Sequence, residues 1–425
     1  MKQGGVLRTL RTSRQRRPSR FWLLALAGAA CSSSAAEAPT GSTGAGGSAQ
    51  VDPDSGASGS AQGGQAAQGG GGAGGSAGAD ATGGSAGAGA TGGSTGAGAT
   101  GGSAGASGSA GSDGGASSQA PAIAGCTMFS ADDPWRQDMR QSPVDATWTA
   151  ALVSGATKKT LHPDFGNAGT EVYGIPINVV PMTQAKVPVS FDYADESDPG
   201  PYPFPSPSVV KIEGGSADNC DGDCHVLAVQ QGTCRLFEGW ACGYASGWHC
   251  GSGAVFDLTR NSYGQRPAGF TSADAAGLAI TPGLVRFSEV AEGVVRHAIR
   301  ITMHCTQDGY VAPASHFAVP TGSGGCPARA SGESVSDYHA RLRAQPFPPM
   351  GLRIRLKSSY AVASLPRQAA VIAQAMQTYG MILADNGSDY YFQGDVDPGW
   401  NDELDALKAI PADAFEVLRP GTIVH

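Results

Sequence analysis

The chain has 425 residues, 64 of them glycine, and a formal net charge of −8. Thirty of the glycines lie in residues 41–120, and no Phe, Trp or Tyr occurs between Leu23 and Met128. This part therefore lacks the large side chains that a packed core requires. Residues 125–425 hold 21 basic and 31 acidic side chains, an excess of negative charge that argues against nucleic acid or an anionic membrane surface as a partner.

The first 30 residues have the composition of an export signal. They contain seven basic and no acidic residues, and the apolar run Phe21–Ala30 directly precedes Cys31. This pattern predicts a secretory signal peptide over residues 1–30, because the apolar run is too short to span a bilayer. The segment Leu26–Cys31 resembles a bacterial lipobox, which implies a lipid attached to Cys31 after cleavage. The alternative is an ordinary signal peptide with an incidental cysteine.

Residues 31–124 consist mainly of Gly, Ala, Ser and Thr, and a nine-residue unit begins at Ala81, Ala90 and Ala99. Calcium-binding nonapeptide repeats need an Asp in every unit, which these units lack. We therefore predict a disordered linker with an r.m.s. reach of about 50 Å. It would hold an exported domain away from a lipid anchor in the cell envelope or at the cell surface, and we expect no other contact with the membrane.

Eight cysteines follow the linker: Cys126, Cys220, Cys224, Cys234, Cys242, Cys250, Cys305 and Cys326. An even number of cysteines in an exported protein indicates disulfide bonds, and eight cysteines leave 105 pairings open. A zinc site is the less favoured interpretation, because no CxxC element is present. The prediction is a disulfide-stapled extracellular domain over residues 125–425.

Short apolar runs separated by turn residues recur along this domain, at residues 186–193, 226–229, 253–258, 297–302 and 351–357. Several of them alternate with period two, which is typical of strands. We predict a mostly β fold, a β-sandwich or jelly-roll-like domain with a few short helices. In the last run Arg353 and Arg355 alternate with apolar residues, so we expect them on an exposed face that could bind substrate.

The C-terminal part contains the clearest helical pattern. A helix capped by Ser364, with Pro366 in its first turn, should run to Gly380. A strand over residues 381–384 should follow, with Asn386-Gly387 as a tight hairpin turn and residues 390–392 as the return strand. A short helix over residues 401–409 and a strand over 415–418 complete the expected elements.

Four phrases of the domain resemble a group of secreted bacterial proteins from actinobacteria and soil proteobacteria, mostly without an assigned activity. They are Pro188–Tyr202, Thr271–Leu278, Pro348–Arg353 and Tyr379–Ser388. The resemblance implies one extracellular domain and assigns no catalytic residue.

The densest group of acidic residues is Asp192, Asp195, Glu196 and Asp198. Four carboxylates in seven residues could supply an acid and a base for glycoside hydrolysis, with Asp195 and Glu196 as candidates. They could equally bind calcium, although we expect no other cofactor. A solvated acidic loop is the third interpretation.

A second candidate is the D-x-D-x-H pattern of Asp221, Asp223 and His225, whose side chains would project to one side of an extended chain. The spacing suits a metal ion or a histidine oriented by a carboxylate. The alternative is a turn held by a disulfide, with exposed acids. His316 also stands next to a strand-like run, and we expect that it could meet His225 across a cleft.

The third candidate is the segment from Glu238 to His249. Its rings Trp240, Tyr244 and Trp248 are separated by small residues and could form a platform for sugar rings. The alternative is that they pack on disulfides in a small core.

The sequence as a whole indicates a surface lipoprotein with a carbohydrate-active domain, a hydrolase or lyase of an extracellular polysaccharide. The predicted catalytic residues are Asp195, Glu196, Asp223, His225, Glu238 and His316, and the predicted substrate-binding residues are Trp240, Tyr244, Trp248, Arg353 and Arg355. The alternative functions are a non-catalytic surface module that binds glycan or protein, and a structural envelope protein.

Overall fold

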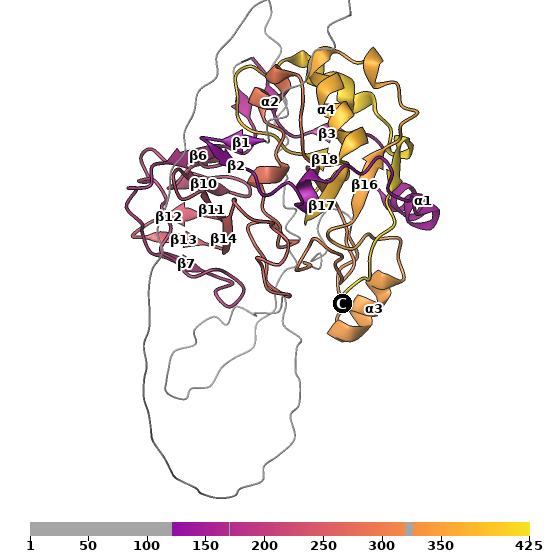
Figure 1. Cartoon of the computed structure of the whole chain (residues 1–425). Coiled ribbons are helices and arrows are strands. Elements are labelled where there is room, and N and C mark those ends of the chain that lie inside the picture. The colour runs from indigo at the N-terminus through magenta and orange to yellow at the C-terminus, as the bar shows by residue number, and fades with distance from the viewer. Residues whose placement is uncertain (1–120, 170, 319–325) are drawn as a thin grey trace, which may run out of the picture. The chain divides into compact units, whose positions relative to one another are not determined.

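The computed structural model describes residues 121–169, 171–318 and 326–425. The predicted signal peptide, Cys31 and nearly all of the predicted linker lie outside these residues. The described part contains more strand than helix, as the sequence predicts (Figure 1). The sandwich or jelly-roll geometry stays a prediction. None of the helices in the described ranges is long and apolar enough to cross a membrane.

One sheet has four strands, in the order β14 (Ser252–Asp257), β11 (Arg235–Trp240), β10 (Val226–Gln230) and β6 (Ile177–Val180). The three strands β10, β11 and β14 are antiparallel neighbours, whereas β6 runs parallel to β10. Every residue of β10 is buried. Both faces of the sheet are therefore covered at this strand, which explains its unbroken apolar run.

A second sheet has six strands, in the order β19 (Phe415–Val417), β16 (Arg353–Leu356), β17 (Met381–Asn386), β15 (Ile299–Met303), β18 (Tyr391–Phe392) and β3 (His162–Pro163). The central pair β15 and β17 is parallel. Both strands are buried over most of their length. One segment of the chain contacts both sheets. Ile175 forms a bridge with Asp395, which follows β18, and two residues later the same segment becomes β6 and pairs with β10.

The remaining strands form small sheets: β12 (Gly243–Tyr244), β13 (Trp248–Cys250) and β7 (Val189–Phe191); β1 (Ala122–Ile123) and β2 (Cys126–Thr127); β4 (Gly166–Asn167) and β5 (Val172–Tyr173); and β8 (Gly215–Ser216) and β9 (Asn219–Cys220). The α-helices are α1 (Ala146–Gly155), α2 (Phe287–Glu292), α3 (Val335–Arg343) and α4 (Arg367–Thr378). The 3₁₀ helices are η1 (Pro134–Arg136), η2 (Thr281–Gly283), η3 (Val362–Ser364), η4 (Asp402–Ala409) and η5 (Ala412–Ala414).

Helix α4 confirms the strongest helical pattern in the sequence. Its residues Ile372, Ala375 and Met376 are buried, and the helix lies beside β16 (Figure 1). Gly380 follows it with φ 74°, a left-handed conformation that glycine adopts without strain. The predicted cap is wrong, because Ser364 belongs to η3 and the helix begins only after Pro366.

The predicted hairpin at Asn386-Gly387 is also wrong. Strand β18 does not pair with β17; it pairs with β15, on the side opposite to β17. The connection between them is held by Asp389, a buried carboxylate that accepts hydrogen bonds from Thr157, Lys158 and His304. A local turn pattern cannot reveal that a third strand is inserted between two sequence neighbours.

The strand predicted around Arg353 and Arg355 exists as β16, but its expected exposed face does not. Both arginines are buried, with 9% and 8% of their surface exposed. Arg353 donates to the carbonyl of Pro134, and Arg355 pairs with Glu416 at 2.6 Å. Burial lowers the pKa of Arg353 to about 10. These two residues hold the segment around Pro134 and Met139 on the sheet. The prediction that they bind substrate is therefore wrong, and their role is structural.

The eight domain cysteines form four disulfides, as predicted: Cys126–Cys234, Cys220–Cys224, Cys242–Cys250 and Cys305–Cys326. The first closes a span of 108 residues and joins the start of the domain to Cys234, the residue before β11. Four disulfides indicate an oxidising, extracellular compartment.

Candidate functional site

A cluster of charged side chains lies around Arg300, the second residue of strand β15. The arginine side chain is only 3% exposed, and the Asp274 side chain beside it is 0% exposed. The Nε atom of Arg300 donates to Asp274 at 3.1 Å, and a second nitrogen contacts the other carboxylate oxygen. A buried charge is tolerated only when it is paired, so this ion pair fixes the loop around Asp274 against the sheet.

A β-bulge places Asp385 on the same side of the sheet as Arg300. Ile301 pairs with Leu383, but Thr302 pairs with Asp385, so Ala384 is the extra residue. Such an insertion shifts the alternation of side chains by one position. The Asp385 carboxylate lies 3.6 Å from Arg300, with 20% of its side chain exposed. The backbone N–H of Asn386 donates to it at 2.7 Å.

The register of the next two strands adds polar residues beside Arg300. Because β18 is antiparallel to β15, the residue that follows β18, Gln393, lies next to Arg300 and accepts a hydrogen bond from it. Asp164 follows β3 in the same way and is hydrogen-bonded to Gln393. On the same face the rings of His162 and Tyr391 stack with centroids 4.1 Å apart, and both are half-buried.

The other sheet contributes His225, the residue before β10. Its side chain is 2% exposed, and its Nδ1 atom forms a short contact with Glu213, whose side chain is 25% exposed. Its Nε2 atom lies 3.3 Å from the carbonyl of Ala273, in the loop that carries Asp274. We call the set Asp164, Glu213, His225, Asp274, Arg300, Asp385 and Gln393 the arginine cluster.

Three carboxyls of the arginine cluster are accessible to solvent: Asp164 is exposed, and Asp385 and Glu213 are partly exposed. The pKa values of Asp385 and Glu213 are shifted in opposite directions. Burial and the negative charge of Asp274 raise the pKa of Asp385 to about 8, against the attraction of Arg300. The pKa of Glu213 is lowered, because its hydrogen bond and attraction to His225 outweigh the effect of burial. The raised pKa favours the neutral form of Asp385, and the lowered pKa favours the ionised form of Glu213.

His225 carries the charge that complements Glu213. Burial disfavours the imidazolium, but the hydrogen bond and charge of Glu213, with a contribution from Asp223, raise the pKa of His225 to about 9. The sequence predicted a histidine oriented by a carboxylate, but Asp223 is not the contacting group. Asp223 is exposed and accepts a hydrogen bond from the indole of Trp240 at 3.4 Å.

Glu238 does not fulfil the predicted catalytic role, because it is fully buried and out of reach of a substrate. Its carboxylate accepts hydrogen bonds from the backbone of Ile280 and from the backbone and hydroxyl of Thr281. Burial raises the pKa of Glu238 to about 7, although these hydrogen bonds oppose the shift. Glu238 anchors η2 beside the arginine cluster.

The acidic loop that the sequence emphasised does not form a single site. Asp195 is exposed, Asp192 lies 3.1 Å from the exposed His249, and Asp198 pairs with the buried Arg266. Their carboxylates therefore have separate partners.

Glu196 and His316 do meet, as two of the predicted catalytic residues. The Glu196 carboxylate lies 3.4 Å from Nε2 of His316, and both side chains are 16% exposed. Burial raises the pKa of Glu196 and lowers the pKa of His316. His316 and His225 have different partners. Nδ1 of His316 bonds to the carbonyl of Ala275, whereas Nδ1 of His225 contacts Glu213, so the structure shows no contact between the two histidines.

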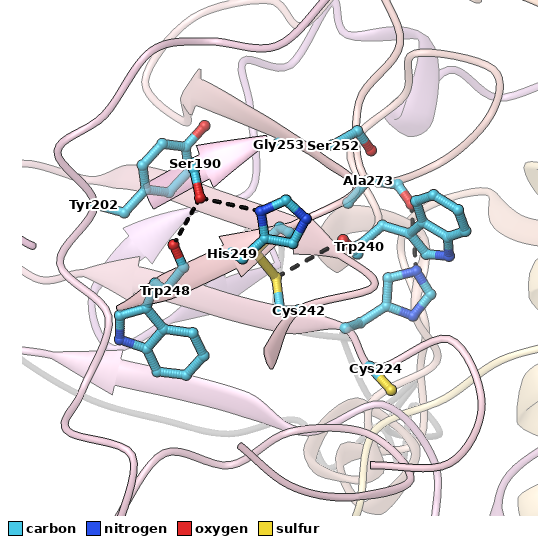
Figure 2. The surroundings of a disulfide bond; sticks show 12 residues. Ser190, Tyr202, Cys224, Trp240, Cys242, Trp248, His249, Ser252, Gly253 and Ala273 are labelled. Carbon is cyan, nitrogen blue, oxygen red and sulfur yellow. Dashed lines mark hydrogen bonds between the residues drawn. A yellow bond between two sulfur atoms is a disulfide. The ribbon is translucent and has the colours of Figure 1, made fainter. Parts of the chain in front are cut away.

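The aromatic segment does not form one platform. Trp248 is 4% exposed and packs edge-on against Phe204 and Tyr244, so its predicted contact with substrate is corrected. Figure 2 shows Trp248 and Trp240 apart from each other, with Cys242 between them and Trp240 beside Ala273. Tyr244 and Trp240 are half-buried, and Trp240 packs against the group of buried residues that contains Ala273, the neighbour of Asp274.

Sequence reasoning missed most of the arginine cluster. Asp274 and Asp385 lie inside two of the phrases that carry the resemblance, and each interrupts a run of small or apolar residues. A charged residue in such a run is a signal for a buried ion pair. Glu213 had no comparable signal, because only the fold brings it to His225.

One group of three potential metal ligands occurs within the described ranges, namely His304, Cys305 and Cys326. Its two cysteines form a disulfide, so the group is accounted for without a metal ion. The calcium interpretation of the acidic loop stays a prediction.

Comparison of the chain with models of protein families, with curated proteins and with solved structures finds no match.

Proposed function

We propose that residues 125–425 are a carbohydrate-active domain that hydrolyses a glycosidic bond in an extracellular polysaccharide. The observation that carries the proposal is the opposite pKa shift of Asp385 and Glu213, two partly exposed carboxyls of one cluster. Glycoside hydrolysis needs one carboxylic acid that is protonated and one carboxylate that is ionised at the same pH.

In this proposal Asp385 is the general acid and donates its proton to the glycosidic oxygen. Glu213 supplies the negative charge that stabilises the oxocarbenium-like transition state as the glycosidic C–O bond breaks. A water molecule then adds to the anomeric carbon and gives its proton to the ionised Asp385, which restores the acid. Arg300 and Asp274 are too deeply buried to touch a substrate. They are positioning residues, because the charge of Asp274 favours the protonated form of Asp385 and Arg300 contacts both Asp274 and Asp385.

The charges favour a hydrolase over a polysaccharide lyase. A lyase that acts on uronates needs a cation to neutralise the substrate carboxylate, and Arg300 already contacts Asp274, Asp385 and Gln393. The domain also has 31 acidic and 21 basic side chains, which disfavours an anionic polymer. The proposed substrate is therefore a neutral polysaccharide.

Two half-buried aromatic surfaces suit the apolar faces of sugar rings. The stacked pair His162 and Tyr391 lies on the face of the sheet that carries Asp385, and Trp240 is hydrogen-bonded to Asp223. We propose that they replace Tyr244 and Trp248 as the aromatic contacts with substrate.

We further propose that the domain is tethered at the cell surface through a lipid on Cys31 and the linker of residues 31–124. Cys31→Ala should release the protein from the membrane fraction into the medium or periplasm. Retention of the variant in the membrane fraction would contradict lipid anchoring.

The proposed activity is tested by incubating the purified, disulfide-bonded protein with a panel of neutral and uronate-containing polysaccharides. We expect new reducing ends from a neutral polymer and no ultraviolet absorbance of unsaturated products. Unsaturated products would favour a lyase. Saturable binding without any product would favour the non-catalytic glycan-binding module.

A further inference from the structure

The small sheet of β12, β13 and β7 brings a serine, a histidine and an aspartate together. His249 in β13 lies directly opposite Ser190 in the parallel strand β7. Asp192 follows Ser190 by two residues, and its backbone N–H donates to the carbonyl of Cys250, so the pairing continues past the end of β7. Residues two positions apart on a strand project to the same face. Ser190 and Asp192 therefore lie on the face that carries His249.

This face of the small sheet is open to solvent. In β7 Ser190 is exposed between two half-buried residues, and in β13 His249 is exposed between two buried ones. The side chains of His249 and Asp192 are 53% and 65% exposed. The disulfide Cys242–Cys250 joins the end of β13 to the residue before β12. The three polar side chains are thus accessible, on a backbone that a covalent bond holds in place.

The three side chains form one line of hydrogen bonds. The Ser190 hydroxyl oxygen lies 3.0 Å from Nδ1 of His249, and Nε2 of His249 lies 3.1 Å from the carboxylate of Asp192. The hydroxyl is also 3.3 Å from the carbonyl oxygen of Trp248 (Figure 2). A nucleophile in contact with a base, and a base oriented by a third group, is the arrangement that activates a serine.

The carboxylate determines which ring nitrogen of His249 carries the proton. A carboxylate only accepts hydrogen bonds, so its contact with Nε2 requires a proton on that nitrogen. In the neutral ring Nδ1 is then an acceptor, and the Ser190 hydroxyl is the donor that faces it. The neutral form of His249 can therefore take the proton of Ser190, while Asp192 stabilises the imidazolium that forms.

We propose that Ser190, His249 and Asp192 form a second site, which cleaves carboxylic esters by transfer of the acyl group to Ser190. The Ser190 oxygen attacks the carbonyl carbon while its proton passes to Nδ1 of His249. The bond from that carbon to the alkoxy oxygen then breaks, and His249 gives the proton to the departing alcohol. None of the three residues belongs to the arginine cluster, so the proposal does not depend on polysaccharide hydrolysis.

A water molecule completes the reaction. His249 takes a proton from the water as it attacks the acyl carbon, and the bond to the Ser190 oxygen breaks. The carboxylic acid leaves, and Ser190 recovers its proton from His249. Because the site is open to solvent, water stabilises the charge that develops on the carbonyl oxygen. The expected gain in rate is therefore that of general base catalysis, about 10²-fold, and the ester can belong to a molecule too large for a cavity.

The nucleophile is tested on the disulfide-bonded full chain with phenylmethanesulfonyl fluoride, which forms a stable sulfonate ester with an activated serine and releases fluoride. Peptide mass spectrometry gives the labelling rate of each serine. The internal reference is Ser154, an exposed serine whose hydroxyl donates to the backbone carbonyl of Ala151 at 3.0 Å. We expect Ser190 to be labelled about 10²-fold faster than Ser154. Equal labelling rates would overturn the proposal.

Ester cleavage is measured with 4-nitrophenyl acetate, from the release of 4-nitrophenolate. Ser190→Ala removes the nucleophile, and His249→Gln leaves a side chain that cannot take the proton. Each should slow the release at least about tenfold, whereas the matched control Ser154→Ala should react like the wild type. An unchanged rate in Ser190→Ala or in His249→Gln, with the fold confirmed by circular dichroism, would also overturn the proposal.

Asp192 is a positioning residue, because it acts only through His249. Asp192→Ala should slow the release of 4-nitrophenolate by about threefold, since an exposed pair contributes little energy. Asp192→Glu returns a carboxylate and should restore the rate, which a purely structural role of Asp192 would not explain. An unchanged rate in Asp192→Ala, or a loss that Asp192→Glu does not restore, would remove Asp192 from the proposed site.

Discussion

The arginine cluster and the acidic loop of residues 192–198 both contain several carboxyls, yet they differ in how those carboxyls are held. In the loop, Asp192 and Asp195 are exposed and their neighbours have separate partners. In the cluster, residues far apart in sequence share one buried arginine. In this protein, acidic residues that are close together in the sequence lie mostly in contact with solvent. Acidic residues that stand within apolar strands and loops form the cluster with shifted pKa values.

The largest expected effect that separates the two regions is on activity. Asp385→Asn should reduce the rate of polysaccharide hydrolysis by a factor of about 10²–10⁴, because it removes the proposed general acid. Asp195→Asn, the control in the acidic loop, should change the rate less than twofold. Reducing-end assays of both variants measure the two rates. A larger loss of activity in Asp195→Asn than in Asp385→Asn would contradict the assignment of the active site to the arginine cluster.

The second effect is on stability. Glu213→Gln removes the partner of the buried, charged His225 and should lower the free energy of unfolding by about 2–3 kcal/mol near pH 7. Asp192→Asn, at an exposed pair with His249, should cost less than about 0.5 kcal/mol. Urea unfolding of both variants measures the difference.

The pH dependence of the Glu213→Gln effect gives a further check. The Glu213–His225 pair requires an ionised glutamate and a protonated histidine. Its stabilisation should be lost as the pH rises through about 9, the pKa of His225. It should also be lost in acid once Glu213 is protonated. A difference from wild type that stays constant from pH 5 to pH 10 would contradict the ion pair.

The third effect comes from the raised pKa of Asp385. The pKa of Asp385 is about 8 in the folded protein and near 4 in the unfolded chain. Its contribution to stability is therefore fully present below pH 4 and is lost as the pH rises toward about 8. Asp385→Asn should therefore raise the free energy of unfolding by about 2 kcal/mol at pH 8 and hardly at all at pH 4. Unfolding curves at the two pH values test the sign, and a destabilised variant at pH 8 would contradict it.

The smallest effect concerns the Glu196–His316 pair, the part of the acidic loop that most resembles the cluster. Because this pair lies outside the arginine cluster and its contact is long, at 3.4 Å, Glu196→Gln should change activity less than threefold and stability by less than about 1 kcal/mol. A hundredfold loss of activity in this variant would move the proposed active site from the arginine cluster to His316.

The sequence predicted the positions of strands and helices better than it predicted which strands pair with each other. Short apolar runs, several of them with period two, predicted β10, β14, β15 and β16, and the helical pattern predicted α4, because these signals depend only on which faces are apolar. The insertion of β15 between β17 and β18 was missed, since strand order depends on contacts distant in sequence. The four disulfides were expected from an even cysteine count, but their pairing was not.

The candidate site was only partly predictable for the same reason. His225 and the need for a neighbouring carboxylate were predicted, but Glu213, the residue that contacts it, has no local signal. The role of Asp385 depends on a one-residue bulge opposite Thr302, which a sequence pattern does not reveal. Conversely, alternation alone suggested an exposed face for Arg353 and Arg355, because it could not show that the segment around Pro134 covers that face.

The central claim is that Asp385 is protonated at neutral pH while Glu213 is ionised. NMR titration of the folded protein with ¹³C-labelled aspartate side chains tests it most directly. We expect one carboxyl signal to titrate near pH 8 and to be missing from the spectrum of Asp385→Asn. If every aspartate carboxyl that titrates does so below about pH 5, as unperturbed aspartates do, Asp385 is not the acid and the proposed mechanism is wrong.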